Sequence, residues 1–80
     1  MADHALTPSL EDLCLLVGLL LGRRGVRAQD RLVEDLGAES ADLVNLVATL
    51  EEKYHVELAE ADVARLHTVA ELHALLARPR

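Results

Sequence analysis

The run from Leu43 to Tyr54 is the feature that most limits what this chain can fold into. Five of its apolar residues fall at i, i+3, i+4, i+7 and i+11, and they are Leu43, Leu46, Val47, Leu50 and Tyr54. Residues at these spacings lie on one side of a helix with 3.6 residues per turn. The pattern therefore predicts an amphipathic helix that buries one stripe.

The composition extends the helical prediction to the rest of the chain. Of 80 residues, 51% are apolar, yet there is one aromatic residue, Tyr54, and there are two prolines. Leucine and alanine favour helices, whereas the β-branched and aromatic clusters that favour strands are scarce. A chain this short forms one domain and leaves little room for a buried catalytic cleft. We expect an all-α domain over residues 1–80, with a folded core of about 7–77, that is not itself an enzyme.

Another helix is expected before this run. It should begin near Thr7-Pro8-Ser9, with Thr7 or Ser9 as its cap, and end at Gly22 or Gly25. Its apolar positions at helical spacing are Leu10, Leu13, Cys14, Val17, Leu20 and Leu21, and Leu15, Leu16 and Leu19 widen the stripe. This run is too short to span a bilayer, which needs about 20 residues.

Two shorter helices are expected after Tyr54, which makes a four-helix bundle. A short one fits Glu60 to Leu66, and the last opens at Thr68 with Glu71 three residues on, the capping-box pattern, and should stop at Pro79.

The first two helices are joined by a long connection, residues 22–39. Within it, Leu32, Val33 and Leu36 are expected to enter the core as a helical turn. Four arginines, Arg23, Arg24, Arg27 and Arg31, either complement the negative end of the first helix or form a partner site.

The charge of the chain is negative and unevenly placed. The formal net charge is −6, and the segment 34–62 holds nine acids and one base, Lys53. Such a balance disfavours nucleic acid and anionic membranes and suits partners with basic patches. Because the N-terminus lacks a basic segment before an apolar one and Cys14 is the only cysteine, we expect a cytoplasmic protein without an internal disulfide.

The helix at 43–54 also has an outward face. Ala41, Val44, Asn45 and Ala48 form a mildly apolar row with acids at both ends. A row of this kind is either an ordinary solvated surface or a docking site for a basic partner.

Ser40 stands where the long connection ends and this helix begins. A serine there is usually a helix cap. Its hydroxyl could also accept a covalent group, because the free amides at a helix N-terminus stabilise an attached phosphate. The two roles do not exclude each other.

The remaining reactive residues offer weaker sites. The histidines, His4, His55, His67 and His73, have no spacing suited to a metal, so we expect scattered surface histidines and no metal site. Cys14 lies within an apolar stripe and is expected to pack in the core.

The run Glu34-Asp35-Leu36-Gly37-Ala38-Glu39-Ser40, followed by Asp42, Val44, Leu46 and Leu50-Glu51-Glu52-Lys53-Tyr54, resembles the acyl carrier protein family. The resemblance extends over nearly the whole chain. It implies that Ser40 receives 4′-phosphopantetheine from coenzyme A through a phosphopantetheinyl transferase, and that the arm carries acyl groups as thioesters. The implied partners are acyl-transfer and chain-elongating enzymes, such as a ketosynthase or an acyl ligase, of fatty-acid or polyketide biosynthesis. Their implied docking residues are Glu39, Ala41, Asp42, Val44, Asn45, Ala48, Glu51 and Glu52.

The chain departs from the family pattern at three of these residues. Glu39 stands where aspartate is usual, Ala41 replaces a leucine, and Asn45 occupies a position that is often acidic. The last two indicate a specialised carrier with dedicated enzymes. The alternative is an unmodified helical interaction module in which Ser40 is only a cap. We expect a monomer, although the apolar first helix leaves a dimer or a permanent partner open.

Overall fold

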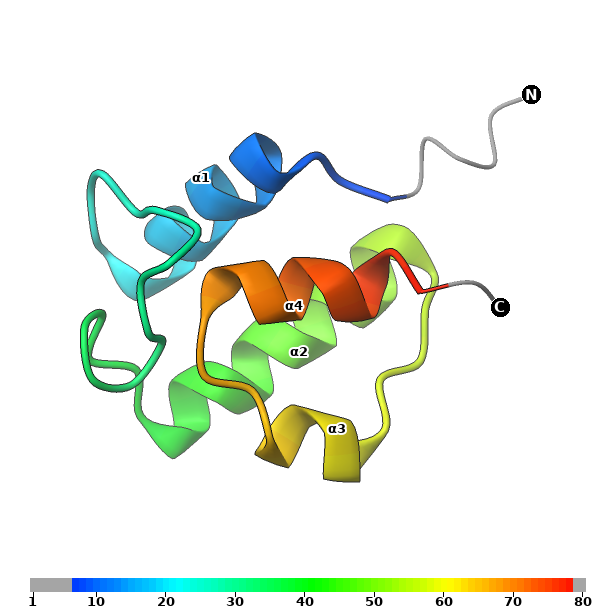
Figure 1. Cartoon of the computed structure of the whole chain (residues 1–80). Coiled ribbons are helices and arrows are strands. Elements are labelled where there is room, and N and C mark those ends of the chain that lie inside the picture. Colours follow the sequence, from blue (N-terminus) through cyan, green and yellow to red (C-terminus); the bar gives the residue numbers. More distant parts are fainter. Residues whose placement is uncertain (1–6, 79–80) are drawn as a thin grey trace.

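The computed structural model describes residues 7–78, which fold into four α-helices. They are α1 (Leu10–Leu21), α2 (Ser40–Tyr54), α3 (Glu60–Ala64) and α4 (Val69–Leu76). Helix α1 packs against α2 and α4, and the short α3 lies on the opposite side of the bundle from α1 (Figure 1). The predicted all-α architecture with a short third helix is confirmed. None of these helices is long and apolar enough to cross a membrane, in the part of the chain that is described.

The core is built from leucine and valine of three helices and the long connection. The side chains that are almost completely buried are Leu13, Val17, Leu32, Leu46, Leu50, Val69, Leu72 and Leu76. Helix α2 buries the predicted stripe, with Leu43, Val47 and Tyr54 half-buried beside Leu46 and Leu50. Leu32 and Leu36 enter the core as expected, but Val33 does not, because 52% of it is exposed.

The helix ends follow the capping patterns closely. The Ser9 hydroxyl accepts a hydrogen bond from the Asp12 N–H at 3.0 Å, and Gly22 ends α1 in the left-handed conformation at φ 69°. Thr68 and Glu71 form the predicted capping box, in which each side chain accepts from the other residue's amide. Helix α3 ends before Leu66, and α4 ends before Pro79, which lies outside the described residues.

The connection between α1 and α2 is tied to the start of α4 by backbone hydrogen bonds. Leu32 N–H donates to the His67 carbonyl at 2.7 Å, and Val69 N–H donates to the Asp30 carbonyl at 3.1 Å. The Asp30 side chain, which the sequence did not single out, is buried and accepts from Arg27 N–H at 2.8 Å. These bonds fix the long connection on the bundle.

None of the four arginines lies in the last turn of α1, which ends at Leu21 with Gly22 as its cap. They lie in the connection, where Arg27 pairs with Asp30 and Arg31 with Asp35, each at 3.3 Å. The interpretation as complements to the helix dipole is therefore wrong for Arg27 and Arg31. The positive charges of Arg27 and Arg31 are therefore paired with acids of the connection itself.

Gly18 is required in α1 by a close backbone approach. A Cβ at this position would lie 2.6 Å from the Arg23 carbonyl oxygen. Gly18→Ala should therefore destabilise the protein by about 1–3 kcal/mol through overpacking, although alanine is the better helix former by about 1 kcal/mol at an ordinary site. Urea unfolding measures the change, with Ala48→Gly in exposed α2 as the control for ordinary helix propensity. A Gly18→Ala variant more stable than the wild type would contradict the packing.

Candidate functional site

Ser40 is the first residue of α2, and its side chain is exposed. Its hydroxyl makes no hydrogen bond within residues 7–78. The cap of α2 is Glu39, which has an extended backbone (φ −99°, ψ 172°) and donates its N–H to the Asp42 carboxylate at 2.9 Å. The prediction that Ser40 caps the helix is therefore wrong. Ser40 is already inside the helix, one residue past the position from which a side chain can reach the free amides.

The chain reaches Ser40 through a tight turn at Gly37. This glycine has φ 72°, a conformation that residues with a side chain rarely adopt. Ala38, directly after it, is buried and donates its N–H to the Leu32 carbonyl at 2.9 Å. The turn therefore anchors Ala38 in the bundle and leaves Ser40 at the surface.

Arg23 holds this turn from the other end of the connection. Its Nε donates to the Leu36 carbonyl at 3.1 Å, across thirteen residues of sequence. In the sequence, Arg23 belongs only to a basic cluster, since no spacing rule relates it to Leu36. We therefore assign Arg23 a positioning role for the segment that leads to Ser40.

The electrostatics at Ser40 combine two opposite influences. The N-terminus of the fifteen-residue α2 carries free amides and the positive end of the helix dipole, both of which favour a phosphate. The carboxylates of Glu39 and Asp42 oppose it, but Asp42 is engaged with the Glu39 amide. A phosphoester on Ser40 would break no internal hydrogen bond of the described chain, so the residues present fit a phosphopantetheine group.

The predicted docking residues divide into two groups. Glu39, Ala41, Val44, Asn45, Ala48 and Glu52 are exposed, with Val44 at 67%. Asp42 and Glu51 are half-buried and have backbone partners: Asp42 accepts from Glu39, and Glu51 accepts from Leu58 N–H at 2.8 Å. These two acids therefore stabilise the fold around α2 as well as contributing charge.

An apolar groove runs beside the exposed row, between α2 and α3. Its volume is about 330 Å³. It is lined by Leu43, Val44, Val47, Ala48, Leu58 and Val63, with the acids Glu51 and Glu60. The exposed row and this groove together form a continuous apolar surface with acidic residues at its edge.

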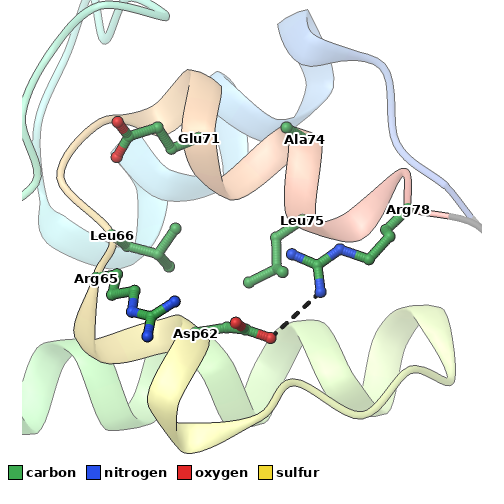
Figure 2. A pocket seen from close by; sticks show the side chains of 7 residues that line it. All are labelled: Asp62, Arg65, Leu66, Glu71, Ala74, Leu75 and Arg78. Atoms are coloured by element: carbon green, nitrogen blue, oxygen red, sulfur yellow. Dashed lines mark hydrogen bonds and ion pairs between the residues drawn. The ribbon is translucent and has the colours of Figure 1, made fainter.

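A second pocket, of about 410 Å³, lies between α3 and α4 and has a different character. Figure 2 shows that Arg78 reaches from the end of α4 to Asp62 of α3, and the two form an ion pair at 3.3 Å. Glu71 also lines this pocket, and the amides of His67 and Thr68 hold the pKa of its carboxyl below the usual value. None of the predicted site residues lies here, so the pocket is not the candidate site.

The histidines and Cys14 form no further site in the part of the chain that is described. His73 is half-buried, with Nε2 at 2.9 Å from the Pro8 carbonyl oxygen, so it is not the surface histidine expected. His55 and His67 are exposed, and His4 lies outside the described residues. Burial raises the pKa of the Cys14 thiol, and nearby Asp30 adds to the effect. Within residues 7–78, no group of three potential ligands could hold a metal ion.

Known proteins are similar to this chain in sequence and in fold. The family described as "phosphopantetheine attachment site" matches residues 11–76. The acyl carrier protein of Campylobacter curvus is 40% identical over 47 residues, which cover 59% of this chain and 61% of the relative. That of Campylobacter lari is 46% identical over 41 residues, which cover 51% and 53%. The chain thus spans about three fifths, or less, of the length of these relatives.

A solved structure gives the same answer for the fold. An acyl carrier protein from Mycobacterium tuberculosis superposes with a TM-score of 0.80 at 28% identity, covering 85% of this chain and 93% of the other. The family match extends over most of the chain and includes Ser40. The resemblance seen in the sequence is confirmed: the chain belongs to the phosphopantetheine attachment site family, that of the acyl carrier proteins, which are carriers and not catalysts.

Proposed function

We propose that Ser40 is the attachment site and that the chain carries acyl groups as thioesters on a 4′-phosphopantetheine arm. One observation carries the proposal: the Ser40 hydroxyl is exposed and without a hydrogen bond at the start of α2. The family match supports the identity of the group, and the tight turn at Gly37 supports the position.

The attachment step needs only an accessible oxygen on this chain. The Ser40 Oγ forms a bond to the phosphorus that bears the pantetheine part of coenzyme A. The bond from that phosphorus to the adenosine bisphosphate part breaks, and the hydroxyl proton is lost to the transferase. The thiol of the attached arm supplies the thioester chemistry, and α2 supplies a fixed, positively polarised end beside the phosphate.

The partners we propose are a phosphopantetheinyl transferase and acyl-transfer or chain-elongating enzymes of fatty-acid, polyketide or related biosynthesis in the cytoplasm. The exposed α2 row, with Glu39 and Glu52 near its ends, suits enzymes with basic patches. Ala41 presents less apolar surface than the family's usual leucine, and Asn45 presents no charge. Both differences favour a dedicated set of enzymes.

The alternative of an unmodified interaction module loses one of its premises. It assigned Ser40 to the helix cap, but Glu39 fills that position. An exposed Ser40 without a capping role is compatible with attachment.

The proposal is tested by incubating the full chain with coenzyme A, Mg²⁺ and a broad-specificity phosphopantetheinyl transferase. Intact mass should rise by one phosphopantetheine group. The same reaction with an acyl-coenzyme A in place of coenzyme A should attach the acylated arm in one step, and hydroxylamine should then remove the acyl group, as expected for a thioester. Absence of any adduct, with this transferase and with that of the source organism, would overturn the proposal.

Docking through α2 predicts a charge effect at Glu52. Reversing the charge of Asp42 also removes the bond to the Glu39 amide, whereas exposed Glu52 has no ion pair within residues 7–78. Glu52→Lys should slow modification roughly three- to ten-fold at low salt, because a basic partner is attracted less. Single-turnover rates measure it, and Glu57→Lys makes the same charge change outside the row. Equal rates for the two variants would remove Glu52 from the docking surface.

A further inference from the structure

Helix α1 leaves a second apolar surface exposed, away from α2. Its inner side packs on α2 and α4, but Leu15 and Leu19 on its outer side are 69% and 78% exposed. A groove of about 420 Å³ lies at these two side chains. It is lined by Cys14, Leu15, Gly18, Leu19, Arg23, Arg24, Gly25 and Val26. We call Leu15, Leu19 and this groove the α1 face.

The α1 face has an unpaired charge of each sign. Glu11, one turn before Leu15, is exposed and forms no ion pair in the described part of the chain. Arg24, in the loop that follows Gly22, lines the groove, is exposed, and has no partner between residues 7 and 78. The nearby Arg27 and Arg31, by contrast, are paired within their own loop.

This order of acid, two leucines and base is complementary to itself. Glu11, Leu15 and Leu19 follow one another at four-residue intervals, so they lie along one side of α1. The point midway between the two leucines is about 9 Å along the axis from Glu11. Arg24 lies in the loop after Gly22, which packs back on Gly18, just past that point. A second α1 placed antiparallel about that point brings Leu15 against Leu19 of the other copy and Glu11 toward its Arg24.

We propose that the α1 face binds a second copy of this chain, giving a twofold-symmetric dimer with antiparallel α1 helices. In such an interface each contact occurs twice, so both free charges of each copy gain a partner. The antiparallel arrangement also places the two helix dipoles side by side in opposite directions, which is the favourable orientation. This dimer replaces the monomer expected from the sequence, and it does not depend on the modification of Ser40.

The dimer should be weak and should leave the carrier site open. A helix of twelve residues is about 18 Å long, so one pair of such helices buries less than the roughly 1,200 Å² typical of stable interfaces. Glu39, Ser40 and the exposed row of α2 are not part of the α1 face. Both copies therefore remain accessible to a transferase.

Sedimentation velocity of the full chain, from about 10 µM to about 1 mM at low salt, tests the dimer. The dimer fraction should rise across this range. Leu19→Gln should weaken association roughly ten-fold or more, whereas Val44→Gln, the same kind of change on exposed α2, should leave it unchanged. Circular dichroism of both variants checks that they keep their helices.

A charge swap tests the antiparallel pairing itself. Glu11→Arg and Arg24→Glu should each weaken the dimer several-fold, and the double variant should restore it, because the pairs re-form with opposite sign. A wild-type chain that stays monomeric at about 1 mM, the upper end of the range, would overturn the proposal. A dimer that is insensitive to Leu19→Gln, or a double variant without recovery, would overturn it as well.

Discussion

Ser40→Ala should abolish attachment of phosphopantetheine completely, because the variant lacks the oxygen that forms the phosphoester. The fold should be unaffected, since the Ser40 hydroxyl makes no hydrogen bond in the described chain. The change in unfolding free energy should stay within about 0.5 kcal/mol, as for other surface substitutions. Intact mass after treatment with transferase and coenzyme A measures the first effect, and urea unfolding the second.

The other serine of the chain provides a matched control. Ser9 caps α1 and accepts the Asp12 amide at 3.0 Å. Ser9→Ala should therefore show the reverse pattern, with full modification and a loss of about 1 kcal/mol of stability. An adduct on the Ser40→Ala protein would move the attachment site elsewhere, and loss of the adduct in Ser9→Ala would show that the assay reports folding instead.

Leu50→Ala should cause the largest loss of stability, about 2–5 kcal/mol, through a cavity at the centre of the bundle. Leu50 is completely buried on α2. A domain of 80 residues has about 4–12 kcal/mol of stability in total, so this single change removes a large part of it. Urea unfolding followed by circular dichroism measures the loss.

Val44→Ala on the same helix is the control for Leu50. Val44 is 67% exposed, so its truncation should change stability by no more than about 0.5 kcal/mol. The contrast tests which side of α2 faces the core. Comparable losses in the two variants would mean that the helix is rotated from the orientation described.

The helices could be predicted because local rules determine them. The spacing of Leu46 and Leu50 gave α2 and its buried side, and the capping pattern at Thr68 and Glu71 gave the start of α4. The outward row of α2 followed from the same periodicity. Where a helix has one apolar stripe and packs on one core, the sequence is sufficient to predict which side is buried.

The cap of α2 and the arrangement of the long connection could not be predicted in this way. Serine is the commoner cap, but α2 begins at Ser40 itself, and Glu39 takes the cap position. The bond between Arg23 and the Leu36 carbonyl and the burial of Asp30 depend on where the connection folds back. Such contacts are tertiary, and no spacing in the sequence encodes them.

In α1 the apolar pattern could not predict which side of the helix the bundle covers. Its leucines are so numerous that the pattern marked nearly the whole middle of the helix as apolar, yet the bundle covers only one side of it. Leu15 and Leu19 therefore remain exposed in the single chain. Which leucines the bundle leaves uncovered is seen only in the folded chain, which is why the proposed dimer rests on the structure.

The most direct test of the account is to locate the phosphopantetheine group by tryptic digestion and fragmentation mass spectrometry of the modified protein. Cleavage after Arg31 and Lys53 yields the peptide 32–53, which contains Ser40 and Thr49 as its only hydroxyl side chains. The account predicts the group on this peptide and, within it, on Ser40. A group on any other residue, or a fully modified protein with an unmodified peptide 32–53, would contradict it.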